Sequence, residues 1–418
     1  MRGVEEQARP IGARCEARSP GAARSAAIFV PGPSAASLAD APGGLTLLDR
    51  QLKQLRKLDM GDVTLLVPAQ YPVPILSASV GTPRIVRVAA TVNDLWSALT
   101  AAADELAPTV LALAGNYLVD LRALRALVAC EETTVVSAED GRAVPIAWVR
   151  IDDVRRSGSE IATRAARLPL ASLDPYSPEL RGTAIPYAFA VATEADRVRA
   201  WEVLFDHVQK RALDLPGQYF DTPFENFLVR RFAPTEVTPN QITLATLVLA
   251  AFVATLFAHG WLRVGVLLAL VVGVLDGVDG KLARMKLATS KLGELEHVGD
   301  FLYENAWYLS LAAWFAAAAG SAAYWYAGLV LVACDLADSL LYLVAQKQTG
   351  KMLDELTPFD RRFRAIAGRR NVYVMIFVTG FFAGHAATAF LVAVGWAATT
   401  VAVHVVRVSS VVRSAPSD

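Results

Sequence analysis

Hydrophobic and polar positions follow two different patterns along this chain, and the change comes near Pro239. Before Pro239, short apolar runs alternate with stretches whose apolar residues recur at helical spacing. These patterns predict strands at 27–31, 63–68, 109–115 and 133–138, and helices at 45–58, 93–106 and 121–129. Such alternation favours right-handed crossovers and a parallel sheet covered by helices on both faces. The first half is therefore predicted to be a three-layer α/β domain.

The Asp140-Gly141 turn lies between two apolar runs, at 135–139 and 143–149. An Asp-Gly pair in this context is a hairpin signal, because tight hairpin turns need residues that tolerate positive φ. We expect this hairpin at the edge of the sheet.

After Pro239 the chain contains long apolar segments with few charges. Six can be drawn, at 241–258, 262–275, 301–319, 325–344, 372–383 and 386–406. A membrane-spanning helix needs about 20 residues, so the second and fifth segments must borrow polar neighbours. The second half is predicted to be an all-α polytopic membrane domain of six transmembrane helices.

Loop charges predict the orientation of these helices. The loops of one side carry nearly all the basic residues, while the opposite loops offer only Arg263 and His385. Because positive residues stay on the cytoplasmic side, we expect both termini and both basic loops to be cytoplasmic, in the inner or cell membrane. The basic residues are Arg230, Arg231, Lys281, Arg284, Lys286, Lys291, Lys347, Lys351, Arg361, Arg362, Arg364, Arg369, Arg370, Arg407 and Arg413.

Composition excludes several classes of protein. The 418 residues carry 40 basic and 40 acidic side chains, and the mean hydropathy is +0.37. These values exclude a disordered chain and a basic nucleic-acid binder, and they are too apolar for an ordinary soluble enzyme. The three cysteines are too few and too far apart for a disulfide framework. The predicted organisation is a flexible tail or over-extended start (1–25), the α/β domain (26–205), a juxtamembrane helix and linker (206–238) and the membrane domain (239–418).

Two pairs of acidic residues flank the basic loop between the second and third segments. Asp276 and Asp279 are spaced i, i+3, and Glu296 and Asp300 are spaced i, i+4, so each pair shares a helix face. Gly280 and Gly293 would form the corners of the loop, which would bring four carboxylates together at a membrane boundary. Unpaired, this charge density is unfavourable, and hard oxygen ligands suit magnesium or manganese.

This stretch resembles the signature of the CDP-alcohol phosphatidyltransferases, in which acidic, glycine, alanine and arginine residues recur at long, irregular spacings. The matching positions are Asp276, Asp279, Gly280, Ala283, Arg284 and Gly293. Residues 237–243 (VTPNQIT) also resemble the start of that family's first membrane helix. The resemblance extends from about Asp206 to the C-terminus.

The second acidic pair departs from the signature. Without a gap, the third and fourth acidic positions of the family signature fall on His297 and Phe301, and the fourth position then holds no acid that could act as a general base. Deleting one residue after Gly293 places them on Glu296 and Asp300, which keeps the i, i+4 spacing. We favour this register. His297 is then either a packing or hydrogen-bonding residue at the start of the helix, or a substitute ligand.

The resemblance implies a metal-dependent transfer of a substituted phosphate from a CDP-linked donor to an alcohol, with release of CMP, in phospholipid biosynthesis. Two divalent ions, Mg²⁺ or Mn²⁺, would be held by Asp276, Asp279, Glu296 and Asp300. Asp300 would also accept the proton of the acceptor hydroxyl. The nucleotide would lie against Asn240, Thr243, Gly280, Ala283, Arg284 and Gly293. The donor would be CDP-diacylglycerol or a CDP-polyol, and the acceptor an alcohol or polyol phosphate.

The first half resembles the sugar-phosphate nucleotidyltransferases, as in bifunctional inositol-phosphate cytidylyltransferase/phosphotransferase enzymes. Two departures weaken the nucleotide site that this resemblance implies. The Gly-rich loop at 31–44 has neither Lys nor Arg, so triphosphate charge would go uncompensated, and Asn116 replaces a metal-binding Asp. We favour a degenerate domain, with a surviving cytidylyltransferase or an altered nucleotide-binding module as alternatives.

Further polar residues in the membrane half have more than one interpretation. Arg361, Arg362, Arg369 and Arg370 could bind an acceptor phosphate or anionic lipid. Asp335 and Asp338 could line the polar cavity or pair with a neighbouring basic helix, and Glu304 and Asn305 would support the acidic face. The alternative functions are a catalytically impaired scaffold and an ion-coupled transporter. The family often forms homodimers, and no feature of this sequence decides the oligomeric state.

Overall fold

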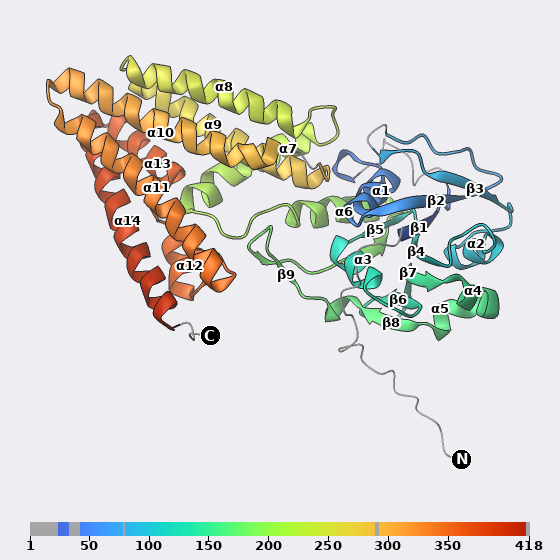
Figure 1. Cartoon of the computed structure of the whole chain (residues 1–418). Helices are drawn as coiled ribbons and strands as arrows, with labels where there is room; N and C mark the ends of the chain where they lie inside the picture. The colour runs from blue at the N-terminus through green and yellow to red at the C-terminus, as the bar shows by residue number, and fades with distance from the viewer. Residues whose placement is uncertain (1–23, 33–41, 78–79, 289–291, 415–418) are drawn as a thin grey trace. The chain divides into compact units, whose positions relative to one another are not determined.

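The computed structural model describes residues 24–32, 42–77, 80–288 and 292–414, without the side chains of 292–298 and 411–414. The chain divides into two compact units (Figure 1). Unit 1 comprises residues 1–177 and 183–207, and unit 2 comprises residues 178–182 and 208–418.

Unit 1 contains a mixed sheet of seven strands in the order β3-β2-β1-β4-β7-β6-β8. All pairings are parallel except those of β7, which runs antiparallel to both β4 and β6. The strands are β1 (Arg24–Phe29), β2 (Met60–Pro68), β3 (Arg84–Val88), β4 (Thr109–Ala114), β6 (Thr134–Ser137), β7 (Ala143–Arg150) and β8 (Ala166–Pro169).

The predicted hairpin forms, but its predicted place at the sheet edge is wrong. β6 and β7 are joined through the turn at Gly141, whose φ is 76°. β7 pairs with the central strand β4, and β8 pairs with β6 on the outer side. The chain between β7 and β8 forms the short helices α4 (Ile151–Ser157) and α5 (Ile161–Arg164), and it returns beyond the hairpin to add the last strand.

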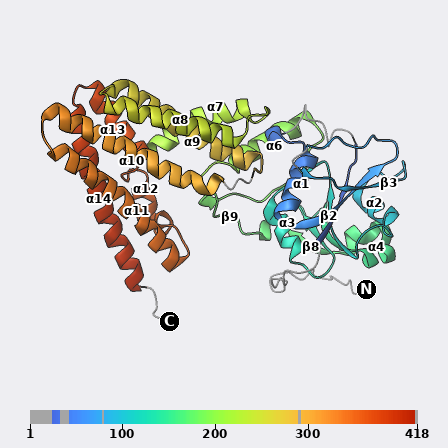
Figure 2. The same ribbon diagram turned by 45° about the horizontal axis from the view of Figure 1, so that its top comes forward.

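Two hydrophobic cores flank this sheet. Alternate residues of β1 enter different cores: Ala26 and Ile28 pack with α1 (Leu47–Lys57) and α3 (Leu121–Val128), whereas Ala27 and Phe29 pack with α2 (Leu95–Ala101) and α4. Figures 1 and 2 show these two pairs of helices on opposite sides of the strands. The remaining elements of the unit are β5 (Tyr117–Val119), β9 (Tyr176–Ser177), β10 (Gly182–Thr183), β11 (Ala188–Ala190) and α6 (Glu194–Asp206).

Unit 2 is helical in its described part. The segment predicted as a juxtamembrane helix and linker (206–238) contains the π-helical turn η6 (Gly217–Asp221), and Pro216 before it already has helical φ and ψ, as proline commonly does in the first turn of a helix. The helices that follow are α7 (Thr222–Phe232), α8 (Pro239–Ala258), α9 (Leu262–Met285), α10 (Leu292–Ala319), α11 (Ala323–Thr349), α12 (Pro358–Arg364), α13 (Arg370–Phe382) and α14 (Ala386–Ser414).

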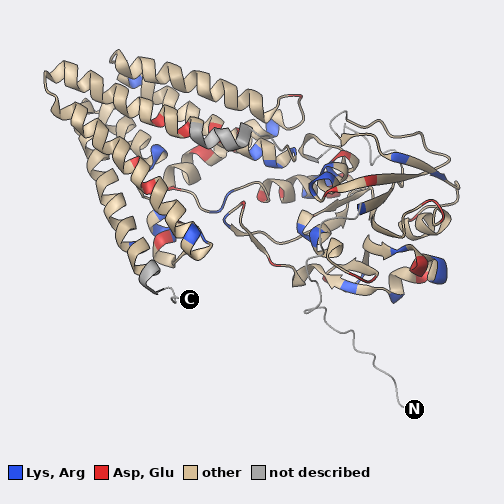
Figure 3. Cartoon of the chain, in the orientation of Figure 1, with Lys and Arg blue, Asp and Glu red and all other residues tan. Residues whose placement is uncertain are grey.

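Three helices of the described chain are long and apolar enough to cross a membrane: α8, α11 and α14. The helix α13 is apolar but shorter. Figure 3 shows long uncharged stretches along these helices, with the charged side chains of unit 2 gathered mostly toward one end of the helices. Their shared core is built largely from aromatic and small residues, among them Trp307, Tyr308, Phe377 and Phe390.

The helix that carries the first acidic pair is longer than predicted. α9 continues to Met285, so Gly280 lies inside the helix and does not form a loop corner. The extension Lys281–Met285 consists of good helix formers, and Lys281, Leu282 and Met285 are buried. Gly293 likewise lies within α10. The connection between the two helices is therefore shorter than the sequence pattern indicated.

Candidate active site

Asp276 and Asp279 lie on one side of α9, and partners from other helices hold both carboxylates. Asp279 is 2% exposed, and the Thr243 hydroxyl of α8 donates a hydrogen bond to its Oδ2 at 2.8 Å. Thr243 lies in the second turn of α8, a helix that opens with a capping box between Thr238 and Gln241. The start of the first apolar helix is thereby fixed against the second motif aspartate.

Arg370, the first residue of α13, neutralises the other aspartate. Its Nη2 lies 2.5 Å from Asp276 Oδ2, and its Nη1 lies 3.2 Å from Glu304 Oε1 of α10. The same Nη1 donates to the Tyr303 hydroxyl. All four side chains are largely buried, so the two carboxylates compensate a cation that would otherwise be costly to bury. The sequence had indicated supporting roles for Glu304 and an acceptor role for Arg370, but not their contact.

The second acidic pair is described only in part. Asp300 lies in α10 and is half-buried, whereas the side chains of Glu296, His297 and Gly293 lie outside the described residues. No three acidic, His or Cys side chains of the described part are grouped closely enough to hold a metal ion. Asp276 and Asp279 nevertheless supply hard oxygen donors from one helix, a chemistry that fits a divalent cation whose remaining ligands would come from α10.

The other residues predicted to contact a nucleotide surround the same end of α9. Asn240 is exposed in the first turn of α8, and Gly280 and Ala283 are half-buried on α9. The Arg284 guanidinium donates from Nε to the carbonyl oxygen of Val208 at 2.9 Å. This contact ties the end of α9 to the backbone of Val208.

The four arginines proposed for the acceptor are separated by the fold. Arg370 reaches Asp276, as described above, and Arg369 lies over the ring of Tyr342, 4.6 Å from its centroid. Arg361 and Arg362 are exposed on α12. The structure therefore brings one of the four into direct contact with the acidic pair.

A second polar layer lies beside α9, in residues that the sequence reasoning did not select. Asn371 donates from Nδ2 to Asp221 Oδ2 at 3.0 Å and lies 3.4 Å from Asp214 Oδ1. Burial, followed by the charges of Glu225 and Asp214, raises the pKa of Asp221 to about 7. The available signal was the repeated acidic residues of the segment that precedes the first apolar helix, which was predicted to be a juxtamembrane helix and linker without a role in the site.

Acidic residues farther along α11 also have defined partners. Asn305 of α10 donates from Nδ2 to Asp335 Oδ2 at 2.8 Å, and Asp338 pairs with Nδ1 of the buried His404 of α14. The partner of Asp338 is thus a histidine on the neighbouring helix α14.

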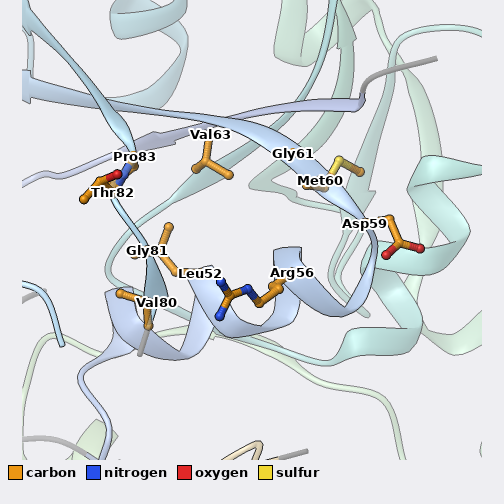
Figure 4. Close-up of a pocket in the computed structure, with 10 residues that line it drawn as sticks. All are labelled: Leu52, Arg56, Asp59, Met60, Gly61, Val63, Val80, Gly81, Thr82 and Pro83. Atoms are coloured by element: carbon orange, nitrogen blue, oxygen red, sulfur yellow. The ribbon is translucent and has the colours of Figure 1, made fainter. Parts of the chain in front are cut away.

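In unit 1, the structure offers less for chemistry. Asn116 is half-buried after β4, and residues 33–41 of the Gly-rich loop lie outside the described chain. A pocket of about 450 Å³ opens where β2 and β3 begin, between Arg56, Asp59 and the Gly81 turn (Figure 4). Open α/β sheets bind ligands at the carboxyl ends of their strands, and the predicted nucleotide loop follows the carboxyl end of β1. This pocket lies instead where β2 and β3 begin, at the opposite ends of the strands.

Comparison with known families now identifies the second half. Residues 236–406 match the family model of the CDP-alcohol phosphatidyltransferases, so the C-terminal part of the chain is a domain of this enzyme class. Together with the three apolar helices, this domain indicates an integral membrane protein.

Two individual proteins are similar to parts of the chain. A bifunctional IPC transferase and DIPP synthase of Rubrobacter xylanophilus is 38% identical over 103 residues, which cover 23% of this chain and 23% of that protein. The crystal structure of a phosphatidylinositol phosphate synthase of Mycobacterium tuberculosis with CDP-DAG bound matches with 18% identity and a TM-score of 0.34. That match covers 45% of this chain and 93% of the solved chain.

Proposed function

We propose that this protein is an integral membrane CDP-alcohol phosphotransferase of phospholipid biosynthesis. It transfers a substituted phosphate from a CDP-linked donor to an alcohol or polyol phosphate and releases CMP. The observation that carries the proposal is the pair Asp276 and Asp279, fixed on one helix by Thr243 and Arg370 inside the segment that matches the family.

In this proposal α9 and α10 supply the metal ligands. Asp276, Asp279, Glu296 and Asp300 would hold two divalent ions, Mg²⁺ or Mn²⁺. When bound, such ions neutralise charge on the entering and leaving oxygens of a phosphoryl transfer. Members of this family generally depend on divalent metals.

The remaining chemistry belongs to side chains of this chain. Asp300 takes the proton of the acceptor hydroxyl while the hydroxyl oxygen attacks the β-phosphorus of the donor. A bond from that oxygen to phosphorus forms, the bond to the bridging oxygen breaks, and CMP leaves with the bond's electron pair. Thr243 holds Asp279 in place, and Arg370 orients Asp276 while balancing the charge of Glu304.

The architecture we propose around this site has six transmembrane helices, with α9, α10 and α13 joining the three long apolar ones. Basic loops place both termini and the active site on the cytoplasmic side. The three-layer unit 1 is proposed to be a nucleotidyltransferase-like domain that has lost its triphosphate site, since residues 31–44 contain no basic residue and Asn116 replaces an acid.

The test is a donor and acceptor screen with the purified full-length protein. CDP-diacylglycerol and CDP-polyols are each combined with polyol phosphates, and CMP and the phosphodiester product are measured with and without Mg²⁺. We expect CMP release with at least one combination, its loss with EDTA and its return with excess Mg²⁺. Absence of CMP release from every combination, in protein that is folded and monodisperse, would overturn the proposal.

A further inference from the structure

The segment 214–226, which we call the juxtamembrane brace, buries several polar side chains. Asp214, Asp221 and Glu225 are between 4% and 8% exposed. The brace begins with a loop, in which the Gly217 N–H donates to Asp214 Oδ1 at 2.7 Å, and continues through η6 into α7. π-helical turns of this kind are frequent at functional sites, because they redirect side chains along a helix.

One end of the brace holds α9. The ammonium of Lys281, a residue only 3% exposed, lies 2.7 Å from Glu225 Oε2 and donates to Asn226 Oδ1 at 2.8 Å. Gly277 lies one turn earlier on the same face, and a Cβ at this position would overlap the Glu225 carboxylate. Gly277 and Lys281 therefore form a slot for Glu225 on the helix that carries the acidic pair.

The other end of the brace holds α13. Asp221 and Asp214 both face the side-chain amide of Asn371, whose neighbour in sequence is Arg370. Asn371 also lies against Gly273 of α9, since a Cβ at Gly273 would be 3.7 Å from Asn371 Oδ1 and 4.0 Å from Asp221 Oδ1. A Cβ at Gly273 would make ordinary contacts, so the close approach of the brace to α9 depends on Gly277.

Buried ion pairs are weak sources of stability, and apolar residues of similar size often replace them without loss. The contacts of the brace are, however, placed next to the proposed chemistry. Gly277 follows Asp276, Lys281 comes two residues after Asp279, and Asn371 follows Arg370. The brace contacts described above are therefore made to the sequence neighbours of these functional residues.

We propose that the juxtamembrane brace positions α9 and α13 for the transfer reaction, with Glu225 and Lys281 as the central positioning residues. The inference rests on the proposed function. Glu225 and Lys281 set the rotation and depth of α9, so that Asp276 and Asp279 face α10. The Asn371 contact sets the start of α13, so that Arg370 meets Asp276. Small displacements of reacting groups lower the reaction rate strongly. An ion pair that does not touch the substrate can therefore still affect the rate through the position of α9.

The test uses the full-length protein with three changes at the pair: Lys281→Met, Glu225→Gln, and the exchange of both charges in Glu225→Lys with Lys281→Glu. Arg407→Met is the matched control, because Arg407 pairs with the buried Asp360 at 2.7 Å between α14 and α12, and neither residue is part of the brace or of the acidic pair. Mn²⁺ binding without substrate, kcat and KM for CMP release, and the midpoint of thermal unfolding are measured for each protein.

We expect Lys281→Met to weaken Mn²⁺ binding and to lower kcat by about 10-fold or more, with little change in KM. The charge exchange should recover part of both losses, while Arg407→Met should lower only the unfolding midpoint. If Lys281→Met and Glu225→Gln lower the midpoint but leave Mn²⁺ binding and kcat as in the wild type, the pair is merely structural and the inference is wrong. If the wild type itself neither binds Mn²⁺ nor releases CMP, the proposed function fails and the inference falls with it.

Discussion

Both units of this chain bury charged side chains, such as Asp49, Arg50 and Asp120 in unit 1 and Asp279 and Lys281 in unit 2, but they differ in whether these lie beside a candidate site. In unit 1, alternate strand residues fill two hydrophobic cores, and the positions where a nucleotidyltransferase would carry charge hold neutral residues. Unit 2 buries charged side chains among apolar helices, including Arg370 with Asp276 and Glu225 with Lys281.

This difference indicates that unit 2, and not unit 1, carries the residues for catalysis. A charge inside an apolar helical domain is expensive, and such residues in membrane proteins are usually functional. An α/β domain whose ligand site loses its charged residues keeps its hydrophobic cores intact, so it can stay folded without that site. The contrast predicts that changes of charge at the acidic pair and in the brace of unit 2 alter catalysis, whereas changes of charge in unit 1 do not.

The largest effect is expected from Asp279→Asn. The amide keeps the shape of the side chain and can still accept the Thr243 hydrogen bond, but it removes a negative charge from the proposed metal site. We expect CMP release to fall by about 10³-fold or more, since charge neutralisation is the main contribution to phosphoryl transfer. Expression and thermal unfolding should stay close to the wild type. The measurement is the initial rate of CMP release at saturating donor.

The matched change in unit 1 is Asn116→Ala, at the position where the resembled family has a metal-binding Asp. It should leave the same rate unchanged. A loss of CMP release in Asn116→Ala comparable to that in Asp279→Asn would show that unit 1 takes part in the reaction, and would contradict the degenerate interpretation of this unit.

The next effect is on stability, in Arg370→Gln. The change leaves Asp276 and Glu304 close together in a buried site without their cation. Removing one partner of a buried ion pair typically costs about 3–5 kcal/mol, which should lower the thermal unfolding midpoint clearly. Arg370→Lys keeps the positive charge but not the bidentate geometry of the guanidinium, so it should lower the unfolding midpoint less than Arg370→Gln. An unchanged midpoint in Arg370→Gln would mean that these carboxylates are protonated or solvated.

Local patterns predicted the first elements of unit 1, but they missed the strands β3 and β8 and did not give the order of the strands in the sheet. Period-two alternation and helical spacing are properties of single segments, and the strands β1, β2 and β4 lie close to where they were expected. The insertion of β7 between β4 and β6 depends on contacts between distant segments, which periodicity does not contain.

The site shows the same limit. The i, i+3 spacing of Asp276 and Asp279 was enough to predict that both lie on one side of a helix. The pairing of Arg370 with Asp276 joins residues 94 positions apart, and the contacts of Asn371 with Asp214 and Asp221 are more distant still. Such contacts follow from how α9, α13 and the brace pack, so a single sequence read along its length could not indicate them.

A substitution that creates a cavity in the core of unit 1 tests whether the stability of unit 1 affects the reaction. Leu111 is fully buried in β4, where it lies opposite Ala26 and Trp148 of the neighbouring strands. Leu111→Ala should destabilise unit 1 by about 3 kcal/mol through lost burial and an unfilled cavity. At temperatures where unit 1 stays folded, CMP release should match the wild type. Circular dichroism during heating, together with CMP assays at several temperatures, separates the two outcomes.

The smallest effect concerns pH and the brace. The pKa of Asp221 is raised to about 7, mainly by burial, from an ordinary value of 3.8. An acid whose folded-state pKa is raised contributes its full stability below its unfolded pKa and loses it as the pH rises through the folded pKa. The wild type should therefore lose stability between about pH 4 and 7, and Asp221→Asn, which cannot ionise, should lose less. Above pH 7 the variant should be the more stable of the two proteins, because only the wild type carries the cost of a buried charge there. Unfolding midpoints measured from pH 5 to 8 test this, with the exposed Asp152→Asn of unit 1 as the control. Parallel pH profiles for the wild type and Asp221→Asn would show that Asp221 is already ionised and compensated in the folded protein, and that the polar layer of unit 2 is less buried than its geometry implies.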